Sequence, residues 1–559
     1  MNKSAFWIGC AALLAAQAHA QLDNKLIGQP PVDAWPTFHG DYSGQHYSTL
    51  KQINQRNVKN LQQVWSYRLN TAQRGAIVGG TVDVPVAVQL GGGALAGGQM
   101  KATPLFVNGI LYFSIPDHAW AVDAHTGREI WHYYWKTSGG EYIGNRGMAM
   151  YGDWLYFGTP DGHLVSLDAR TGKERWHIQV GDVRLNYYSS PAPVVVKDRL
   201  LVGVSGDALD VPGWLESRNP ETGELIWKWF TTPRKGEPGA ETWPSDFARE
   251  HGGGMTWQPV TYDPELNLIY LPTGNPNPVY APELRKGDNL YSCSIVAINP
   301  DTGKMVWYYQ TSPNEAWDFD ANQVPVLIDT TIDGKPRKVV AQATRNGMYF
   351  LLDRVTGEHI VSTQYAESVN WSLGFNAKGQ PIRNPAKLDQ NGGALISPSN
   401  GGVQNWAAPA YLPETGLLYL NAMQGFDIHY TFGVPDPVTG GREHQAQAVG
   451  GYDMSLRAID IKTGKAKWIH RYAGSEWTPP RPHQVGALLA TAGKLVFSGA
   501  PAGGPGGFMV AYNPDNGRQL WHATLPARVS NTPITYMMNG VQYFVFAADD
   551  TLYAYALPQ

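Results

Sequence analysis

The stretch TSPNEAWDFDANQVPVLID, residues 311–329, places two acidic residues, Asp318 and Asp320, inside an otherwise apolar run. Trp317 and Phe319 flank them, and Val-Pro-Val-Leu-Ile follows. The pattern predicts a strand-like segment with a carboxylate buried among aromatic side chains. Burying an ionised carboxylate is costly unless a positive group lies against it. The stretch therefore predicts a positive partner for Asp318, and a carboxylate kept there for its chemistry rather than for packing.

Six repeated segments indicate the elements that would hold such a site. Each has a turn and, four residues after the turn glycine, a tryptophan: AVDAHTGREIW ending at Trp131, SLDARTGKERW at Trp176, SRNPETGELIW at Trp227, AINPDTGKMVW at Trp307, AIDIKTGKAKW at Trp468 and AYNPDNGRQLW at Trp521. Two further copies are degraded, LLDRVTGEHI, which lacks the Trp, and APAYLPETGLLYL. Asp or Asn opens the turn and Gly closes it at positive φ. The tryptophans are expected to pack between neighbouring sheets.

The spacing of the repeats predicts the fold. Adjacent copies lie about 45 to 55 residues apart, which suits a four-stranded propeller blade. Two larger gaps, of about 80 and 107 residues, are each expected to hold an additional blade with an insertion. We therefore predict an all-β, eight-bladed β-propeller with Trp-docking repeats, in one domain whose core spans about residues 37–557. A pair of stacked sheet domains is the alternative, and the regular Trp docking disfavours it.

Composition agrees with this fold class. The 62 Gly, 40 Pro, 20 Trp and 29 Tyr among 559 residues indicate many short strands joined by turns. The formal net charge of −4 is too small to indicate a nucleic-acid or acidic-lipid partner. Two irregular stretches, residues 364–404 and 425–452, are Gly-, Pro- and aromatic-rich. They are candidates for a substrate cap, since long loops on a rigid scaffold serve binding, or for blade-packing insertions.

The N-terminus predicts export. Residues 1–20 have one Lys, a short apolar stretch and a closing Ala-His-Ala, the layout of a signal peptide cleaved after Ala20. No other stretch is long and apolar enough to cross a bilayer, so we expect residues 21–559 to be an exported, soluble protein. Only Cys293 then remains, which excludes an internal disulfide. Without a Cys-x-x-Cys-His motif there is no covalently attached c-type haem, so electrons would have to pass to another protein.

Four motifs carry a resemblance to a known family. They are WPTFHGDYSGQHYSTLKQINQRNVKNLQQVWSY, HGGGMTWQPVTYDPELNLIYLPTGNPNP, NEAWDFD and ATRNGMYFLLDRVTG. Together they resemble the quinoprotein alcohol dehydrogenases, secreted eight-bladed propellers that bind pyrroloquinoline quinone (PQQ), and the likeness covers nearly the whole mature chain. The resemblance implies a periplasmic enzyme that oxidises a primary or secondary alcohol to a carbonyl. It also implies an external electron acceptor such as a soluble cytochrome c.

The same resemblance gives roles to individual residues. Asp318 matches the base that removes the alcohol hydroxyl proton, and with Asn275 it matches the ligands of Ca²⁺ or a lanthanide. Arg345 matches the arginine that contacts the quinone oxygens and steadies developing negative charge. Trp257, which lies outside the Gly-x-x-x-Trp repeat, matches the indole beneath the quinone. The other matched cofactor contacts are Arg146, for a quinone carboxylate, Ser190 and Ser205, as hydroxyl donors, and Asn405.

The chain departs from the family pattern at its expected metal site. Ala208 stands where the family has a metal-ligating glutamate, and alanine cannot coordinate. Asp207 or Asp210 could take its place, or the metal could rely on Asp318 and Asp320. An aspartate at the position of Asp320 is associated in the family with lanthanide use, and an ordinary polar strand residue is the alternative interpretation.

Three further departures concern the cofactor and substrate. Gly139, Gly140 and Glu141 replace the adjacent disulfide-bonded cysteines that the family often carries, which implies a barer cofactor face. Lys101 replaces a glutamate and could pair with a quinone carboxylate. Val485 lies near the position of a lid tryptophan, which favours an alcohol larger than methanol. A non-catalytic propeller scaffold, like the outer-membrane assembly protein with similar repeats, is the alternative function.

Overall fold

The computed structural model describes residues 21–71, 77–79, 99–206, 211–388, 393–433, 443–474, 486–501 and 506–559. The predicted signal peptide and the positions Asp207, Ala208, Asp210 and Val485 lie outside these ranges. Among the described residues, no helix has both the length and the apolar character needed to cross a membrane.

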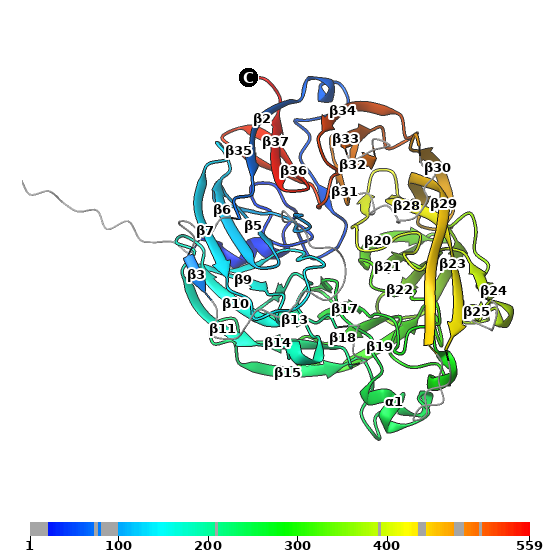
Figure 1. Ribbon diagram of the computed structural model, residues 1–559. Helices are drawn as coiled ribbons and strands as arrows, with labels where there is room; N and C mark the ends of the chain where they lie inside the picture. The colour runs from blue at the N-terminus through cyan, green and yellow to red at the C-terminus, as the bar shows by residue number, and fades with distance from the viewer. Residues whose placement is uncertain are drawn as a thin grey trace, which may run out of the picture.

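The described chain is mostly strand, and its sheets are arranged in a ring (Figure 1). The sheets from the first half of the chain contain β3 (Ile77–Gly79), β4 (Leu105–Val107), β5 (Ile110–Ile115), β6 (His118–Asp123) and β7 (Glu129–Trp135); β8 (Ala149–Tyr151), β9 (Trp154–Gly158), β10 (His163–Asp168) and β11 (Glu174–Gln179); β12 (Val194–Val196), β13 (Arg199–Gly203), β14 (Trp214–Arg218) and β15 (Leu225–Phe230); and β16 (Thr261–Asp263), β17 (Leu268–Pro272), β18 (Ser294–Ile298) and β19 (Met305–Gln310).

The second half of the chain continues the ring. Its sheets contain β20 (Val326–Ile332), β21 (Lys335–Ala343), β22 (Met348–Asp353) and β23 (His359–Gln364); β26 (Ala394–Ile396), β27 (Ala410–Leu412), β28 (Leu417–Phe432), β29 (Glu443–Asp460) and β30 (Ala466–Arg471); β1 (Tyr47–Ser48), β31 (Leu488–Thr491), β32 (Leu495–Pro501), β33 (Gly507–Tyr512) and β34 (Gln519–Leu525); and β2 (Gln62–Arg68), β35 (Ile534–Met538), β36 (Val541–Ala548) and β37 (Thr551–Ala556). The predicted all-β propeller class is confirmed, whereas the number of blades stays a prediction.

The repeated turns dock each sheet on the next, as predicted. In the first repeat, Asp123 Oδ1 accepts hydrogen bonds from the backbone N–H groups of His125 and Thr126 and so closes the turn. The turn glycine, Gly127, has φ +70°, and a Cβ built on it would lie 2.6 Å from the ring of Trp65. The indole N–H of Trp65 donates to the Ala124 carbonyl at 3.1 Å. Equivalent contacts join Trp131 to Ala169, Trp227 to Pro300, Trp307 to Arg354 and Trp468 to Pro514.

Two interpretations of the repeats are wrong. The 80- and 107-residue gaps contain no additional blade in the described chain, because insertions lengthen single sheets, β16–β19 and β26–β30. APAYLPETGLLYL is not a docking turn: Gly416 belongs to the tight β27–β28 connection, and no other atom comes within 4 Å of a Cβ built on it. Where LLDRVTGEHI has lost its Trp, the hydroxyl of Tyr349 donates instead to the Ile461 carbonyl at 2.8 Å.

The two termini close the ring. Strand β2 pairs with β37, which joins residues 62–68 to residues 551–556. Residues 32–48 then tie the innermost strands of several sheets together by backbone hydrogen bonds: Val32 with Met537, Trp35 with Phe106, Tyr42 with Tyr262, Ser43 with Leu327, Gln45 with Tyr411 and His46 with Ala490. Inside this segment the buried rings of His39 and His46 meet, with Nδ1 and Nε2 3.1 Å apart.

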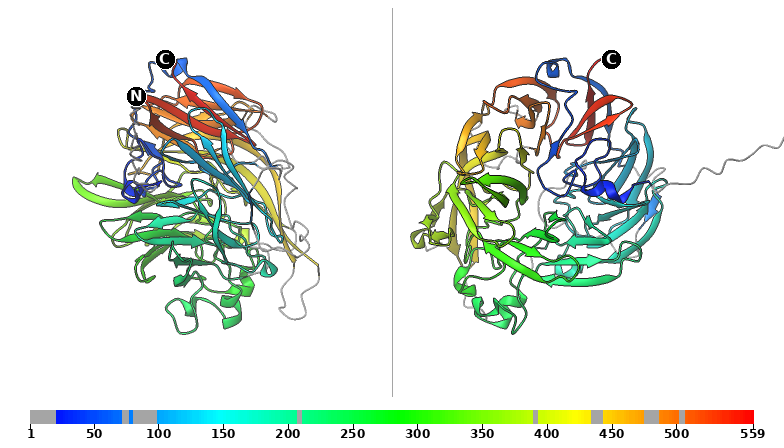
Figure 2. Two further views of the ribbon diagram at one scale, coloured as in Figure 1. Left: turned by 90° about the vertical axis from the view of Figure 1, so that its left-hand side faces the viewer. Right: turned by 180° about the vertical axis from the view of Figure 1, so that it is seen from behind.

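The described parts of both insertions contain regular secondary structure. In the stretch 425–452, residues 425–432 end β28 and residues 443–452 begin β29, and this long strand pair extends along one side of the ring (Figure 2). The stretch 364–404 contains a two-stranded sheet, β24 (Ser372–Phe375) and β25 (Pro381–Arg383), and β26, which pairs with β28. The helical elements are short: α1 (Asp246–Glu250), η1 (Asn24–Gly28), η2 (Val58–Asn60), η3 (Val183–Leu185), η4 (Ala240–Thr242), η5 (Pro282–Arg285) and η6 (Pro385–Lys387).

Candidate functional site

All ten of the predicted site residues lie in connections at one end of the ring. Within each sheet the successive strands are antiparallel, apart from the added β1 and β3, which pair in parallel with β31 and β7. Connections between successive strands therefore alternate between the two ends. The segments that lead into innermost strands, and those between the second and third strands of a sheet, therefore share one end. They carry Lys101, Arg146, Ser190, Ser205, Trp257, Asn275, Asp318, Asp320, Arg345 and Asn405. We call this the Arg345 end.

Arg345 follows β21 and is held on every side of its guanidinium. Its Nη2 donates to Asp318 Oδ2 at 2.9 Å, its Nη1 donates to Asp320 Oδ2, and its Nε donates to the Asn400 carbonyl at 2.7 Å. Burial lowers the pKa of Arg345, but the two carboxylates outweigh burial and raise it above its ordinary value. Gly402 packs directly on the arginine, since a Cβ there would lie 2.0 Å from Arg345 Cγ.

The two aspartates differ in exposure. The side chain of Asp318 is 23% exposed and that of Asp320 only 4%. Asp318 has φ +69°, in the left-handed region. Asp320 Oδ1 accepts the backbone N–H of Asn275 at 2.8 Å, and a Cβ on Gly274 would lie 2.8 Å from the same oxygen. Asp318 is thus the accessible carboxylate, and Asp320 anchors the loop.

The predicted strand-like character of this stretch is wrong, because residues 311–325 form a loop and β20 begins at Val326. The aromatic neighbours pack away from the carboxylates: Trp317 and Phe319 are buried, and both rings contact Trp371. The predicted positive partner of the acidic pair is present and is Arg345.

Asn275, Asp318 and Asp320 are brought together, and their donor chemistry fits a hard cation. Such cations take carboxylate and amide oxygens. Asn275 Nδ2 donates to Asn277 Oδ1 and to the Pro276 carbonyl, both at 3.3 Å, which holds its amide group in place. Among the described residues, no cluster of three or more His, Cys, Asp or Glu could hold a metal ion, so the fit rests on these mixed donors.

Arg146 and its hydroxyl partners form a second part of the site. The Arg146 guanidinium lies over the indole of Trp257, 4.6 Å from the ring centre. Its Nη1 donates to Ser190 Oγ at 2.8 Å, and Ser190 Oγ lies 2.7 Å from Ser205 Oγ. The sequence prediction thus placed four residues that contact one another in the structure.

Lys101 adds another positive charge near Arg146. Its Nζ donates to the Ile143 carbonyl at 2.5 Å and lies 5.7 Å from the ring centre of Trp406. Burial and repulsion from Arg146 lower the pKa of Lys101 to about 8, and burial lowers the pKa of Arg146 to about 10. Neither side chain forms an ion pair with a carboxylate of the described chain. Because burial disfavours the charged forms of both side chains, a multiply charged anion bound beside them would stabilise those charged forms.

Asn405 lies at the same end but contacts none of these charged groups directly. Its Nδ2 donates to the Gly401 carbonyl at 3.1 Å. It is linked to Arg345 only through the backbone, since the Val403 N–H donates to the Arg345 carbonyl at 3.0 Å. Gly140 lies in the stretch where the family often carries adjacent cysteines. It packs so closely that a Cβ built on it would lie 1.7 Å from the Pro160 carbonyl oxygen.

Four residues near Arg345 were missed from the sequence: Tyr280, Glu315, Asn400 and Asp427. The hydroxyl oxygen of Tyr280 accepts a hydrogen bond from Asn400 Nδ2 at 2.9 Å, and burial and the charge of Asp318 raise the tyrosine pKa. Glu315 is buried, which raises its pKa to about 7. Asp427, on β28, accepts the Asn400 N–H at 2.7 Å. Only Glu315 had a local signal, because it belongs to the NEAWDFD motif.

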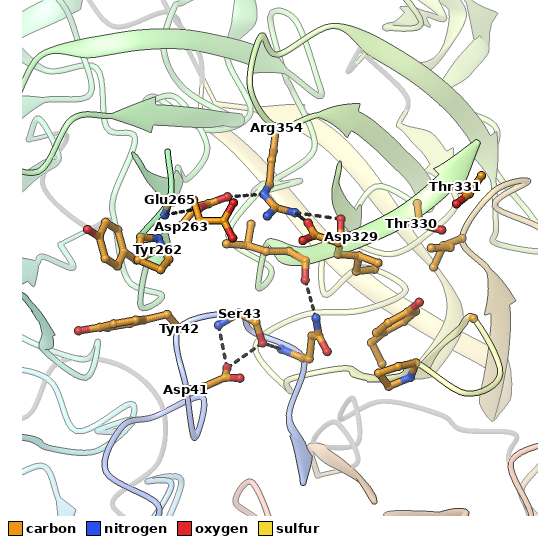
Figure 3. A pocket seen from close by; sticks show the side chains of 18 of the residues that line it. Asp41, Tyr42, Ser43, Tyr262, Asp263, Glu265, Asp329, Thr330, Thr331 and Arg354 are labelled. Carbon is orange, nitrogen blue, oxygen red and sulfur yellow. Dashed lines mark hydrogen bonds and ion pairs between the residues drawn. The ribbon is translucent and has the colours of Figure 1, made fainter. Parts of the chain in front are cut away.

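A pocket of about 760 Å³ lies at the opposite end, which we call the Arg354 end (Figure 3). Arg354 follows β22 and lies 2.7 Å from Asp263 and 2.6 Å from Asp329. Asp41 accepts from the N–H and the hydroxyl of Ser43, both at 2.7 Å. Arg354 is therefore ion-paired within the protein, and Asp41 is held by hydrogen bonds.

Comparisons with known proteins agree with the geometry of the Arg345 end. The profile of a family described as "PQQ: Glucose/ethanol/alcohol dehydrogenase, beta-propeller domain" matches residues 35–370 and 454–544. Quinoprotein alcohol dehydrogenase PedH of Pseudomonas putida is 33% identical over 95% of this chain and 89% of that protein.

Solved structures show the same similarity. A quinohemoprotein alcohol dehydrogenase from Comamonas testosteroni superimposes with a TM-score of 0.80 at 32% identity, over 94% of this chain and 80% of that chain. A europium-containing methanol dehydrogenase superimposes with a TM-score of 0.80 at 27% identity, over 95% and 99% of the two chains.

Proposed function

Because this chain belongs to the PQQ-dependent quinoprotein alcohol dehydrogenases, oxidoreductases that act on alcohols, we propose that it oxidises a primary or secondary alcohol larger than methanol to a carbonyl at the Arg345 end. We further propose a periplasmic location, after removal of residues 1–20, and an external electron acceptor such as a cytochrome c. The scaffold alternative is set aside, since the relatives are enzymes.

The observation that carries this proposal is a pair of neighbouring buried cations, Lys101 and Arg146, beside the Arg345–aspartate cluster. Neither forms an ion pair with a carboxylate of the described chain. PQQ is a flat tricarboxylate, so its carboxylates would complete the charge balance of Lys101 and Arg146. Ser190 and Ser205 would add hydroxyl donors, Trp257 an apolar face and Arg345 donors to the quinone oxygens. When bound, the quinone supplies a hydride acceptor and the metal a Lewis acid.

Asp318 is the proposed base. It is the more exposed of the two carboxylates, and Arg345 keeps it in place at 2.9 Å. Its Oδ atoms would accept the proton of the substrate hydroxyl as the carbon loses hydride. Arg345 would stabilise the negative charge that develops on the acceptor oxygens, because its guanidinium is fixed before the reaction begins.

The metal ligands we propose are Asn275, Asp318 and Asp320. Either Ca²⁺ or a lanthanide suits oxygen donors. The europium named for a structural neighbour and the second aspartate, Asp320, favour a lanthanide for this chain. Asp320 already lies beside Asn275, at 2.8 Å from its backbone nitrogen.

Titration of the purified cofactor-free protein with PQQ, in Ca²⁺ or La³⁺, tests the proposal. Quenching of tryptophan fluorescence reports binding, and dye reduction on a panel of alcohols reports turnover. We expect near-stoichiometric, metal-dependent binding and faster dye reduction with ethanol or longer alcohols than with methanol. Absence of binding with both metals would contradict the proposal, and a preference for methanol would contradict the inferred substrate size.

A further inference from the structure

We propose that Asp427, on the inserted β28–β29 hairpin, is a positioning residue that fixes Arg345 through the backbone of Asn400. The expected effect on kcat rests on the proposed function, whereas the expected change in the position of Arg345 does not. It assigns to the hairpin the role of aligning the site arginine.

Two short hydrogen bonds join Asp427 to Arg345. Asp427 Oδ2 accepts the Asn400 N–H at 2.7 Å, and the Asn400 carbonyl accepts Arg345 Nε at 2.7 Å. Asp427 is fully buried, with 0% exposure. A hydrogen bond to a buried carboxylate is stronger than one to a neutral acceptor, so the position of Asn400 is closely defined.

This anchoring determines which way the guanidinium faces. A guanidinium is planar and its donors point in fixed directions. Since Nε is directed at the Asn400 carbonyl, both Nη groups face Asp318 and Asp320. Release of the Asn400 segment would allow the plane to rotate and would separate the arginine from both aspartates.

The hairpin is itself attached to the site by its inward face. Residues of β28 alternate: Asp427 and His429 are buried, whereas Ile428 is 40% exposed. The His429 ring makes an edge contact with Tyr280 at 5.1 Å between ring centres. From β29, His444 Nε2 lies 3.0 Å from Glu283. The hairpin is therefore joined to the segment after β17 as well as to Asn400.

The first test measures Arg345 in the cofactor-free protein. Phenylglyoxal modification, followed by peptide mass spectrometry, gives the rate at which Arg345 reacts. In Asp427→Ala we expect this rate to rise about fivefold or more, because loss of the anchor opens an otherwise ion-paired side chain. Asp427→Asn retains an acceptor oxygen and should stay close to the unmodified protein.

The matched control is Asp453→Ala on the same hairpin. Asp453 is also fully buried, and it pairs with Arg457 at 2.7 Å, but it has no hydrogen bond to Asn400. We expect this variant to lose thermal stability without exposing Arg345. Equal labelling of Arg345 in Asp427→Ala and the unmodified protein, or equal increases in Asp427→Ala and Asp453→Ala, would overturn the proposal even if PQQ binding failed.

The second test uses the PQQ- and metal-loaded enzyme. In Asp427→Ala we expect kcat to fall about tenfold with the KM for alcohol within about threefold, because arginine alignment matters most when charge develops. In an Arg345→Lys background, Asp427→Ala should lower kcat no further. Additive losses in the double variant would mean that Asp427 acts independently of Arg345, and would overturn the proposal.

Discussion

The same sheet carries an arginine between two aspartates at each of its ends, and the two arrangements differ in what surrounds them. Arg345, after β21, pairs with Asp318 and Asp320, and Arg354, after β22, pairs with Asp263 and Asp329. At the Arg354 end the arginine and its two aspartates are paired with one another. At the Arg345 end, Lys101 and Arg146 have no ion-paired carboxylate among the described residues, so charge balance there calls for a ligand.

An arginine–aspartate cluster is therefore not by itself evidence of a functional site. Buried ion pairs also hold structural turns together. Partial exposure of a carboxylate does not separate the two ends, because Asp329 is 64% exposed and Asp318 23%. What distinguishes the Arg345 end is the neighbouring pair Lys101 and Arg146, cations whose pKa values burial depresses. The pocket at the Arg354 end is roomy, yet its arginine is already ion-paired (Figure 3).

The largest predicted contrast is between Asp318 and Asp329. Asp318→Asn should reduce kcat by about 10³-fold, because general bases contribute 10²- to 10⁴-fold, while the fold is largely retained. Asp329→Asn should leave kcat unchanged. Dye-reduction kinetics and circular dichroism of both variants measure this. Retained turnover in Asp318→Asn would remove that residue from the mechanism.

The two arginines should separate activity from stability. Arg345→Ala should lower kcat by about 10²-fold, since it removes donors to developing charge. Arg354→Ala should lower the free energy of unfolding by about 3 kcal/mol, because it leaves the buried carboxylate of Asp263 unpaired, and should spare kcat. Denaturant unfolding and kinetics of the two variants make the comparison. A large loss of kcat in Arg354→Ala would contradict the division between the ends.

Two glycines at positive φ give a finer comparison. Gly402 (φ +75°) has no room for a Cβ beside Arg345, whereas Gly416 (φ +67°) has nothing within 4 Å. Both alanine variants should lose about 1 kcal/mol of stability to backbone strain. Only Gly402→Ala should also lower kcat, by about tenfold, through displacement of Arg345. Equal kcat values in the two variants would show that Arg345 tolerates displacement.

Cofactor affinity should depend on pH through Lys101. Its folded-state pKa of about 8 is below its ordinary value, so Lys101 loses its charge as pH rises through 8. An anionic ligand favours the charged form, so the affinity for PQQ should fall by up to about tenfold per pH unit above 8. Lys101→Met should bind PQQ more weakly and lose this dependence. Fluorescence titrations between pH 7 and about 9.5 provide the measurement, and an unchanged slope in Lys101→Met would assign the dependence elsewhere.

The smallest effect is expected in the N-terminal segment on the Arg354 end. Burial lowers the pKa of His39 to about 3 and that of His46 well below 6.5. The unfolded chain therefore binds more protons below pH 6.5, and stability should be lost as pH falls from 6.5 towards 3. His39→Gln should reduce the slope of Tm against pH without changing kcat at neutral pH. An identical slope would mean that other groups cause the acid sensitivity.

The sequence by itself determined the local features of this protein. The repeated turns, with Asp or Asn at the start and Gly at the end, and the tryptophan four residues after each glycine specify how one sheet packs on the next. Both signals can be read from the sequence, because the glycine at positive φ forms a local turn and the tryptophan follows it at a constant spacing. Trp257, Arg146, Ser190 and Ser205 were assigned from the resemblance to the family, and the structure brings them into contact. The family assignment followed from such motifs.

Only the tertiary structure decided how charges compensate one another across the chain. The structure adds that Arg345, which was expected to compensate Asp318, also pairs with Asp320, 25 residues away in sequence, and that Asp427 reaches the site through an insertion. Repeat spacing wrongly predicted additional blades because an insertion and a blade add the same length of sequence. The NEAWDFD stretch was wrongly predicted as strand-like because local apolar character does not reveal which side chains face a distant arginine, and electrostatic compensation is a property of distance in space.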